Sequence, residues 1–169
     1  MLVPIFETGG EARIILTKRP ETMPSHRGEI AFPGGKLEAE RDRSPRDAAL
    51  REAHEEIGLD PRHVDVVAEL DGLTTVASRF VLTPFVGLLD TRPQLHPDRS
   101  EVVSVFDVAI SELLRDDVYR EERWDIPADL GITPGRDRAI HFFELADETV
   151  WGATARILAS LLAHLTAGR

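Results

Sequence analysis

The chain has 169 residues, of which 42% are hydrophobic and 30% charged, and its formal net charge at pH 7 is −10. This composition is typical of a globular protein, the length suits a single domain covering residues 1–169, and the negative charge disfavours nucleic acids and anionic membranes as partners. The chain contains no cysteine, which excludes disulfides and a thiol nucleophile. It shows neither a signal-peptide pattern nor an apolar run of membrane-spanning length, so we expect a cytoplasmic location.

The first part of the chain predicts a hairpin followed by a loop and a third extended run. Gly9-Gly10 separates the first two β-rich runs, and residues 20–28 are rich in polar residues and proline, as in a loop. Gly34 and Gly35 follow the third run, where they let the backbone turn sharply and approach a ligand closely. The expected strands of this part lie at residues 1–6, 12–16 and 29–32.

A helix is predicted over residues 45–57. Ser44 is a candidate N-cap, Pro45 suits the first helical position, and Asp47 follows three residues after the cap. Gly58 suits the left-handed position that ends such a helix.

The rest of the chain predicts more strands and a long final helix. Residues 80–89 are mostly apolar, which indicates a central strand, and residues 148–167 have the apolar spacing of an amphipathic helix. Strands interrupted by two main helices predict the α/β class, as an α/β/α sandwich with a mixed β-sheet between helices. The other elements expected here are strands at 64–73, 101–108, 118–124 and 139–145 and a short helix at 111–115.

Three glutamates share one face of the predicted helix. Glu52, Glu55 and Glu56 have the spacing i, i+3 and i+4, so their carboxylates repel one another unless a cation neutralises them. A hard divalent cation with oxygen ligands fits this set, and a solvated acidic helix face is the alternative interpretation.

The stretch from Gly34 to residue 59 resembles the Nudix box, G-x5-E-x7-R-E-U-x-E-E-x-G-U, in which U is apolar. Residues 51–59, REAHEEIGL, fit its last nine positions. The spacing before them is longer than in the box, as an insertion in the loop would make it. Glu38, Glu40 and Asp42 are therefore all candidates for the first acid of the box.

The resemblance to Nudix hydrolases implies an α/β/α fold and hydrolysis of a small-molecule nucleoside diphosphate linked to another moiety. It implies Mg²⁺ or Mn²⁺ held by Glu52, Glu55 and Glu56, and a homodimer as a possible assembly. Arg51 matches the box arginine, whose implied role is to pair with a box acid and hold the loop on the helix. Glu101 is a candidate base or additional metal ligand, or else an ordinary carboxylate at the start of a strand.

A second motif narrows the resemblance to the coenzyme A pyrophosphatase subfamily. The sequence LTKR ending at Arg19, Gly28 and the FPGG of residues 32–35 match the subfamily pattern LLTxR-(SA)-x3-R-x3-G-x3-FPGG, whereas Pro20 and Pro24 depart from it. Residues 150–155, VWGATA, also resemble the C-terminal region of this subfamily, and we expect Trp151 to be a packing residue.

The subfamily resemblance suggests what the basic and glycine residues do. Arg19 and Arg27 are candidates to contact phosphates or the ribose 3′-phosphate, because a guanidinium group suits such anions, or they are solvated loop cations. Gly34 and Gly35 are the other candidate substrate-binding residues.

The predicted substrate is coenzyme A or an acyl-CoA, with 3′,5′-ADP and 4′-phosphopantetheine or its acyl form as products. One alternative is a Nudix hydrolase of ADP-ribose, NADH, a dinucleoside polyphosphate or an oxidised nucleotide. A non-catalytic nucleotide-binding module is the other, although such a module does not need three mutually repelling carboxylates.

Overall fold

A mixed β-sheet lies at the centre of the protein. The computed structural model describes residues 1–22, 27–74, 81–126 and 135–167. Strand β1 pairs parallel with β7 and antiparallel with β2, and β7 pairs antiparallel with β4. Strand β2 also pairs antiparallel with β3 and β8. Strand β7 has β1 on one side and β4 on the other, so it lies in the interior of the sheet; it covers residues 85–89 of the central strand predicted at 80–89, whereas residues 81–82 pair in a separate two-stranded sheet. The strands are β1 (Leu2–Thr8), β2 (Glu11–Lys18), β3 (Ile30–Ala31), β4 (Asp65–Glu69), β7 (Phe85–Leu89) and β8 (Ser104–Ala109).

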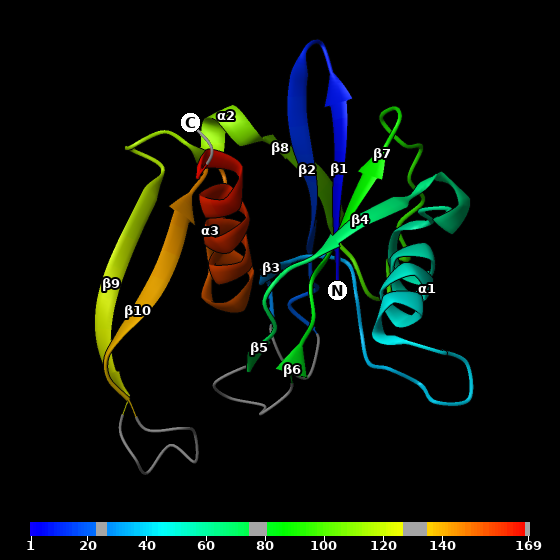
Figure 1. Ribbon diagram of the computed structural model, residues 1–169, viewed down its shortest axis with the longest axis horizontal. Coiled ribbons are helices and arrows are strands. Elements are labelled where there is room, and N and C mark those ends of the chain that lie inside the picture. The colour runs from blue at the N-terminus through cyan, green and yellow to red at the C-terminus, as the bar shows by residue number, and fades with distance from the viewer. Residues whose placement is uncertain (23–26, 75–80, 127–134, 168–169) are drawn as a thin grey trace.

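Helices cover both faces of this sheet (Figure 1). The apolar side chains of β1 alternate between the two faces: Leu2 and Phe6 pack in the cluster under α1 (Pro45–Ile57), whereas Val3 and Ile5 pack in the cluster under α3 (Gly152–Thr166). The period of two in a strand thus gives the sheet two buried faces. The predicted α/β/α sandwich is confirmed.

Helix α1 has the predicted bounds, because its local signals form the predicted caps. The Ser44 Oγ accepts a hydrogen bond from the Asp47 N–H at 3.1 Å, and Pro45 occupies the first turn. Gly58 has a left-handed backbone, with φ 69°, and its N–H bonds back to the helix. Ala49, Ala53 and Ile57 form the buried stripe of the helix.

A second, three-stranded sheet lies on the other side of α3 (Figure 1). It consists of β9 (Tyr119–Ile126), β10 (Gly135–Glu144) and β11 (Thr149–Trp151), in the order β11-β10-β9. The short elements of the described chain are β5 (Leu73–Thr74), β6 (Val81–Leu82), α2 (Ile110–Leu113) and a 3-10 turn at Pro61–His63.

Several predicted bounds are wrong. The final helix begins at Gly152 and not at residue 148, because residues 149–151 pair with β10 as a strand. The strand expected at 101–108 begins at Ser104, which leaves Glu101 in a turn. Trp151, predicted to be a packing residue, is 44% exposed and lies outside the buried core.

Within the described ranges, no helix is long and apolar enough to cross a membrane.

Candidate active site

The loop at Gly34 and Gly35 closes on the glutamates of α1. The Gly34 N–H donates to the Glu56 Oε2 at 2.9 Å. A Cβ atom at position 35 would lie 2.3–2.4 Å from the carboxylate atoms of Glu52, so only glycine fits there without displacing that side chain. The glycine backbone thus comes close to two acids of the helix, and the close approach to a ligand that the sequence predicts here stays a prediction.

Glu56 is the buried acid of this site. Its residue is 5% exposed, and burial raises the pKa of its carboxyl to about 7; the Gly34 N–H acts in the opposite direction. The charges of Glu52 and Glu101 raise this pKa further, because both carboxylates lie close enough to repel a charge on Glu56. The structure thus brings Glu52, Glu56 and Glu101 together from α1 and from a turn 45 residues further on.

Arg19 lies beside these acids at the end of β2. Its Nη1 is 4.0 Å from the Glu56 Oε1, and its side chain is 24% exposed. The Nε atom is buried and finds no acceptor among the described residues. A buried N–H without an acceptor costs free energy, so this guanidinium is suited to an anion that enters the site.

Arg27 is exposed. It follows the segment 23–26, which contains Pro24 and lies outside the described residues. Pro20, the other departure from the subfamily pattern, is buried. The 3′-phosphate contact predicted for Arg27 stays a prediction.

Arg51 joins the preceding loop to α1. Its Nε and Nη2 donate to the two Asp42 carboxylate oxygens at 2.8 and 2.9 Å, and Nη2 also donates to the Lys36 carbonyl. The Arg51 guanidinium holds the Asp42 pKa at about 2. Of the three candidates for the first box acid, Asp42 is the one with this two-bond pairing, whereas Glu38 lies 3.9 Å from Arg51.

Glu55 is oriented differently from its neighbours. Its carboxylate accepts hydrogen bonds from Arg41 and, at 2.8 Å, from the Arg51 Nη1. The bond from Arg41 lowers the Glu55 pKa. Arg41 is thus a site residue that the sequence analysis missed, since no spacing rule connects a loop arginine to an acid 14 residues later.

The donor set suits a hard divalent cation. Carboxylate oxygens are the ligands that Mg²⁺ and Mn²⁺ prefer, and buried acids that repel each other gain most from a cation. Over the described ranges, no three acid or histidine side chains already lie at metal-ligand spacing, and Glu55 is bonded to two arginines. Glu52, Glu56 and Glu101 therefore have the donor atoms that such a cation prefers, but they do not lie at metal-ligand spacing here, and Glu52 and Glu55 are both bonded to Arg51.

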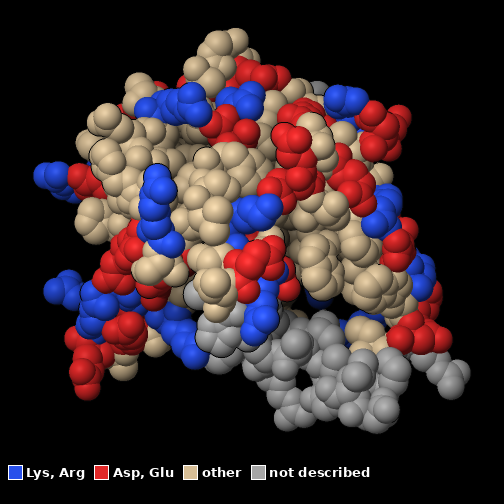
Figure 2. Space-filling model, turned by 180° about the vertical axis from the view of Figure 1, so that it is seen from behind, with Lys and Arg blue, Asp and Glu red and all other residues tan. Residues whose placement is uncertain are grey.

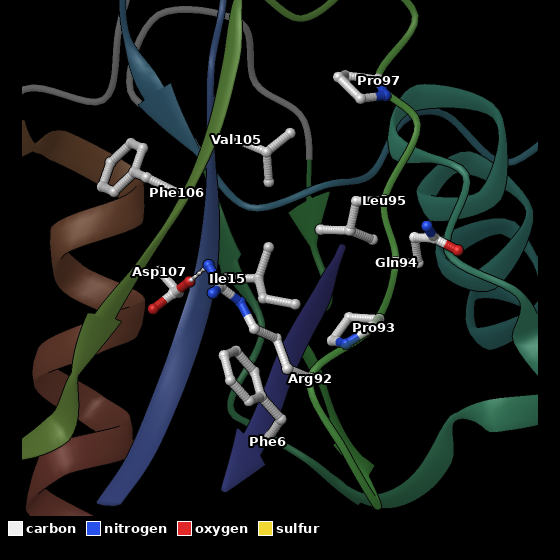
Figure 3. A pocket seen from close by; sticks show the side chains of 10 residues that line it. All are labelled: Phe6, Ile15, Arg92, Pro93, Gln94, Leu95, Pro97, Val105, Phe106 and Asp107. Atoms are coloured by element: carbon white, nitrogen blue, oxygen red, sulfur yellow. Dashed lines mark hydrogen bonds and ion pairs between the residues drawn. The ribbon is translucent and has the colours of Figure 1, made fainter. Parts of the chain in front are cut away.

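A separate cavity of about 350 Å³ lies on the α1 side of the sheet, under the loop at 90–100 (Figure 3). Phe6, Ile15, Leu95 and Val105 are among its lining residues, and none of the predicted site residues is.

Figure 2 shows basic side chains interspersed with acidic ones over the back of the molecule, as expected from the many arginine–acid pairs. Among the helix glutamates, Glu56 lies near Arg19, Glu55 pairs with Arg41, and Glu52 pairs with Arg51.

A glycine loop, a glutamate-bearing helix and the partly buried Arg19 thus meet on an α/β/α sandwich, and this arrangement suits a protein that handles an anionic phosphate compound and a divalent cation. The NUDIX domain model matches residues 1–130, and this chain belongs to the Nudix family. The family generally uses divalent metal ions, which agrees with the donor set.

Three curated relatives illustrate the match. The chain is 40% identical over 165 residues to "Nudix hydrolase 22, chloroplastic" of Arabidopsis thaliana, covering 94% of this chain and 52% of that protein. It is 36% identical to "Uncharacterized Nudix hydrolase NudL" of Enterobacter sp. (strain 638), with coverage of 95% and 79%. It is 37% identical to "Peroxisomal coenzyme A diphosphatase NUDT7" of Mus musculus, with coverage of 87% and 58%. The chain spans about half the length of the two Arabidopsis relatives.

Solved structures agree on the fold. A MutT/nudix family protein from Enterococcus faecalis superposes with a TM-score of 0.59 at 16% identity, covering 97% of this chain and 60% of that one. The Nudix hydrolase RenU from M. smegmatis superposes with a TM-score of 0.56 at 22% identity, covering 66% and 70%.

Proposed function

We propose that this protein is a metal-dependent pyrophosphohydrolase that cleaves the diphosphate of coenzyme A or acyl-CoA. The observation behind the proposal is that a buried arginine donor without an acceptor lies next to a buried acid: the Arg19 Nε has no acceptor in the described chain, and its Nη1 lies 4.0 Å from Glu56, which is 5% exposed. Such a site has a donor for a phosphate oxygen and ligands for the cation that accompanies a diphosphate.

Glu52, Glu56 and Glu101 are the proposed ligands of Mg²⁺ or Mn²⁺, and Glu55 joins them when the cation replaces its bonds to Arg41 and Arg51. When bound, the metal ion neutralises phosphate oxygens and lowers the pKa of water. In the reaction, the oxygen of water bonds to one phosphorus and the bridging P–O bond breaks. The proton of the water leaves to a carboxylate of this acid group, and the products are 3′,5′-ADP and 4′-phosphopantetheine or its acyl form.

The remaining residues orient the substrate. Arg19 donates to a phosphate oxygen, and the backbone of Gly34 and Gly35, which lies against Glu56 and Glu52, is the proposed main-chain contact of the diphosphate. Arg27 is the proposed contact of the ribose 3′-phosphate. Arg51 does not touch substrate in this proposal; it holds the loop on α1 through Asp42.

The coenzyme A substrate is supported by the subfamily motif around Arg19 and residues 32–35, and by the mouse relative, which is named as a coenzyme A diphosphatase. The other curated relatives given above are named as Nudix hydrolases without a substrate.

A product assay tests this substrate. Purified protein with Mg²⁺ or Mn²⁺ is given CoA, acetyl-CoA, dephospho-CoA, ADP-ribose, NADH and 8-oxo-dGTP. We expect preferred cleavage of the CoA compounds with release of 3′,5′-ADP. Preference for another diphosphate would contradict the CoA substrate and keep the hydrolase, and absence of turnover on the whole panel would favour a binding module.

The role of Arg27 has its own test. Arg27→Ala is expected to raise the KM for CoA more than the KM for dephospho-CoA, which lacks the 3′-phosphate, while Arg62→Ala, an exposed arginine paired with Asp60, changes neither. Equal increases for both substrates would remove Arg27 from 3′-phosphate recognition.

The predicted homodimer stays a prediction. The cytoplasmic location also stays a prediction, since the names of relatives include chloroplastic, mitochondrial and peroxisomal proteins.

A further inference from the structure

The last carbonyls of α1 have their hydrogen-bond partners in a distant loop. The final C=O groups of a helix lack intrahelical donors. Here the His96 N–H donates to the Ile57 carbonyl at 2.8 Å, and the Asp98 N–H donates to the Glu56 carbonyl at 2.9 Å. The loop is thus fastened to the main chain of the residue whose carboxylate lies in the site.

Asp98 also forms the turn that contains Glu101. Its carbonyl accepts from the Glu101 N–H at 3.0 Å and from the Val102 N–H at 2.8 Å. Its Oδ1 accepts from the Ser100 N–H at 2.9 Å and from the Ser100 Oγ at 2.7 Å, and these bonds lower the Asp98 pKa. A single residue therefore bonds to the main chains that bear both acids.

The chain on the far side of Glu101 is fixed as well. Val102 is 1% exposed and packs in the cluster under α1, and the Val103 N–H donates to the Lys18 carbonyl at 2.9 Å. Glu101 is held between this buried anchor and the turn at Asp98, so little freedom remains in where its Cα lies.

The loop before Asp98 is anchored to the sheet. Figure 3 shows Arg92 reaching across to Asp107 of β8, where its Nη2 donates at 2.8 Å, and Leu95 pointing toward Ile15 and Val105. The cavity of about 350 Å³ separates the loop from the strands there. Because the loop is attached at Asp107 and at the end of α1, a change at Asp98 acts on the turn and not on the whole loop.

We propose that Asp98 is a positioning residue that sets the placement of Glu101 relative to Glu56, an inference that rests on the proposed hydrolysis. Sequence contains a local sign of this role, since Asp-x-Ser is typical of a turn in which the aspartate accepts from the backbone two residues later. An ordinary turn residue supports only its own loop. Asp98 differs because its N–H donates to the main-chain carbonyl of Glu56, while its side chain accepts from the Ser100 N–H in the turn that contains Glu101.

Three variants test the proposal by steady-state kinetics. Asp98→Ala removes the side-chain acceptor and is expected to lower kcat roughly tenfold with KM changed less than about twofold, as for residues that orient a ligand of a metal. Asp98→Asn keeps an oxygen acceptor and restores kcat to within about twofold of the wild type. Asp60→Ala, which removes the matching bond from the Arg62 N–H at 2.9 Å in another turn, is the control and leaves kcat unchanged.

A double-mutant cycle shows whether Asp98 acts through Glu101. In a Glu101→Gln background, Asp98→Ala is expected to cause no further loss of kcat, because residues of one unit are not additive. An equal loss in both backgrounds, or an unchanged kcat in Asp98→Ala alone, would overturn the proposal.

Two measurements separate this claim from the proposed function. Asp98→Ala is expected to speed amide hydrogen exchange of Glu101 and Val102, and to weaken Mn²⁺ binding by the same factor as Glu101→Gln. Unchanged exchange and Mn²⁺ affinity would overturn the positioning role. A wild-type protein that cleaves no diphosphate would overturn the hydrolase instead, and these two measurements would still decide the role of Asp98.

Discussion

Two arginines in this protein lie among carboxylates in different surroundings. Arg51 has a side chain 13% exposed, and the side chain of its partner Asp42 is 1% exposed. Arg120 lies on β9 of the second, three-stranded sheet, which we call the outer sheet. Its side chain is 43% exposed, and those of its partners Glu122 and Glu144 are 42% and 41% exposed.

The difference concerns what each arginine holds together. Arg51 bonds to the Lys36 carbonyl and to Asp42, and Asp42 accepts from the Glu38 N–H at 2.8 Å, so this network fixes a loop on the helix of the site. The Arg120–Glu122 pair lies within β9, and the Arg120–Glu144 pair joins β9 to β10, which backbone pairing already aligns. Because exposed pairs contribute little to stability, we expect changes near α1 to be costly and equivalent changes on the outer sheet to be tolerated.

The largest expected effect is on catalysis. Glu56→Gln is expected to lower kcat by about 10²–10⁴-fold while the fold stays intact, because it removes a charge from the proposed ligand and proton-acceptor group. Glu122→Gln on the outer sheet is the matched control, with kcat unchanged. Kinetics and circular dichroism check both, and near-normal turnover of Glu56→Gln with a CoA substrate would sink the ligand assignment.

The second expected effect is a pH dependence of stability without metal. Burial raises the Glu56 pKa from 4.5 to about 7, so between these values the folded state binds more protons than the unfolded state. The free energy of unfolding therefore decreases as pH rises through this window, by about 3 kcal/mol for this group.

Chemical denaturation of the wild type and Glu56→Gln in EDTA, from pH 4.5 to 8, measures this effect. The glutamine does not titrate, so the wild type is expected to lose stability relative to the variant as pH rises. Mn²⁺ is expected to restore the wild type at pH 8. A difference that stays constant with pH would contradict the buried, uncompensated carboxylate.

Removing the two arginines compares the networks directly. Arg51→Ala is expected to lower the melting temperature by roughly 5–10 °C, because Asp42 loses its partner, and Arg120→Ala by less than about 2 °C. Calorimetry checks both variants. Similar shifts would mean that burial does not distinguish the two networks.

The smallest expected effect concerns Arg41. Arg41→Ala frees Glu55 from a competing cation and is expected to lower the Mn²⁺ concentration for half-maximal activity by roughly two- to fivefold, in keeping with a half-exposed pair. Arg62→Ala is the matched control. A higher Mn²⁺ requirement in Arg41→Ala would show that Arg41 assists the metal site and does not compete with it.

The sequence predicted those parts of the fold whose signals are local. Ser44, Pro45 and Gly58 determine the ends of α1 within one turn of the chain, so its bounds agree with the prediction. The apolar spacing around Val150 suits a helix equally well, and only the pairing of residues 149–151 with β10 makes a strand there.

The site was predictable in composition and not in geometry. The spacing of Glu52, Glu55 and Glu56 placed them on one helix face, but it did not indicate that Glu56 is buried under Gly34 whereas Glu55 bonds to Arg41. These outcomes depend on where the loop before α1 folds back, which is a tertiary property.

Mn²⁺ binding to the metal-free protein, measured by isothermal titration calorimetry, tests the central claim most directly. The account predicts that the wild type and Glu122→Gln bind Mn²⁺ with the same affinity and that Glu56→Gln loses at least about tenfold, as expected when a ligand is removed. Equal binding by the wild type and Glu56→Gln would contradict the claim that the buried Glu56 and the neighbouring acids form the metal site.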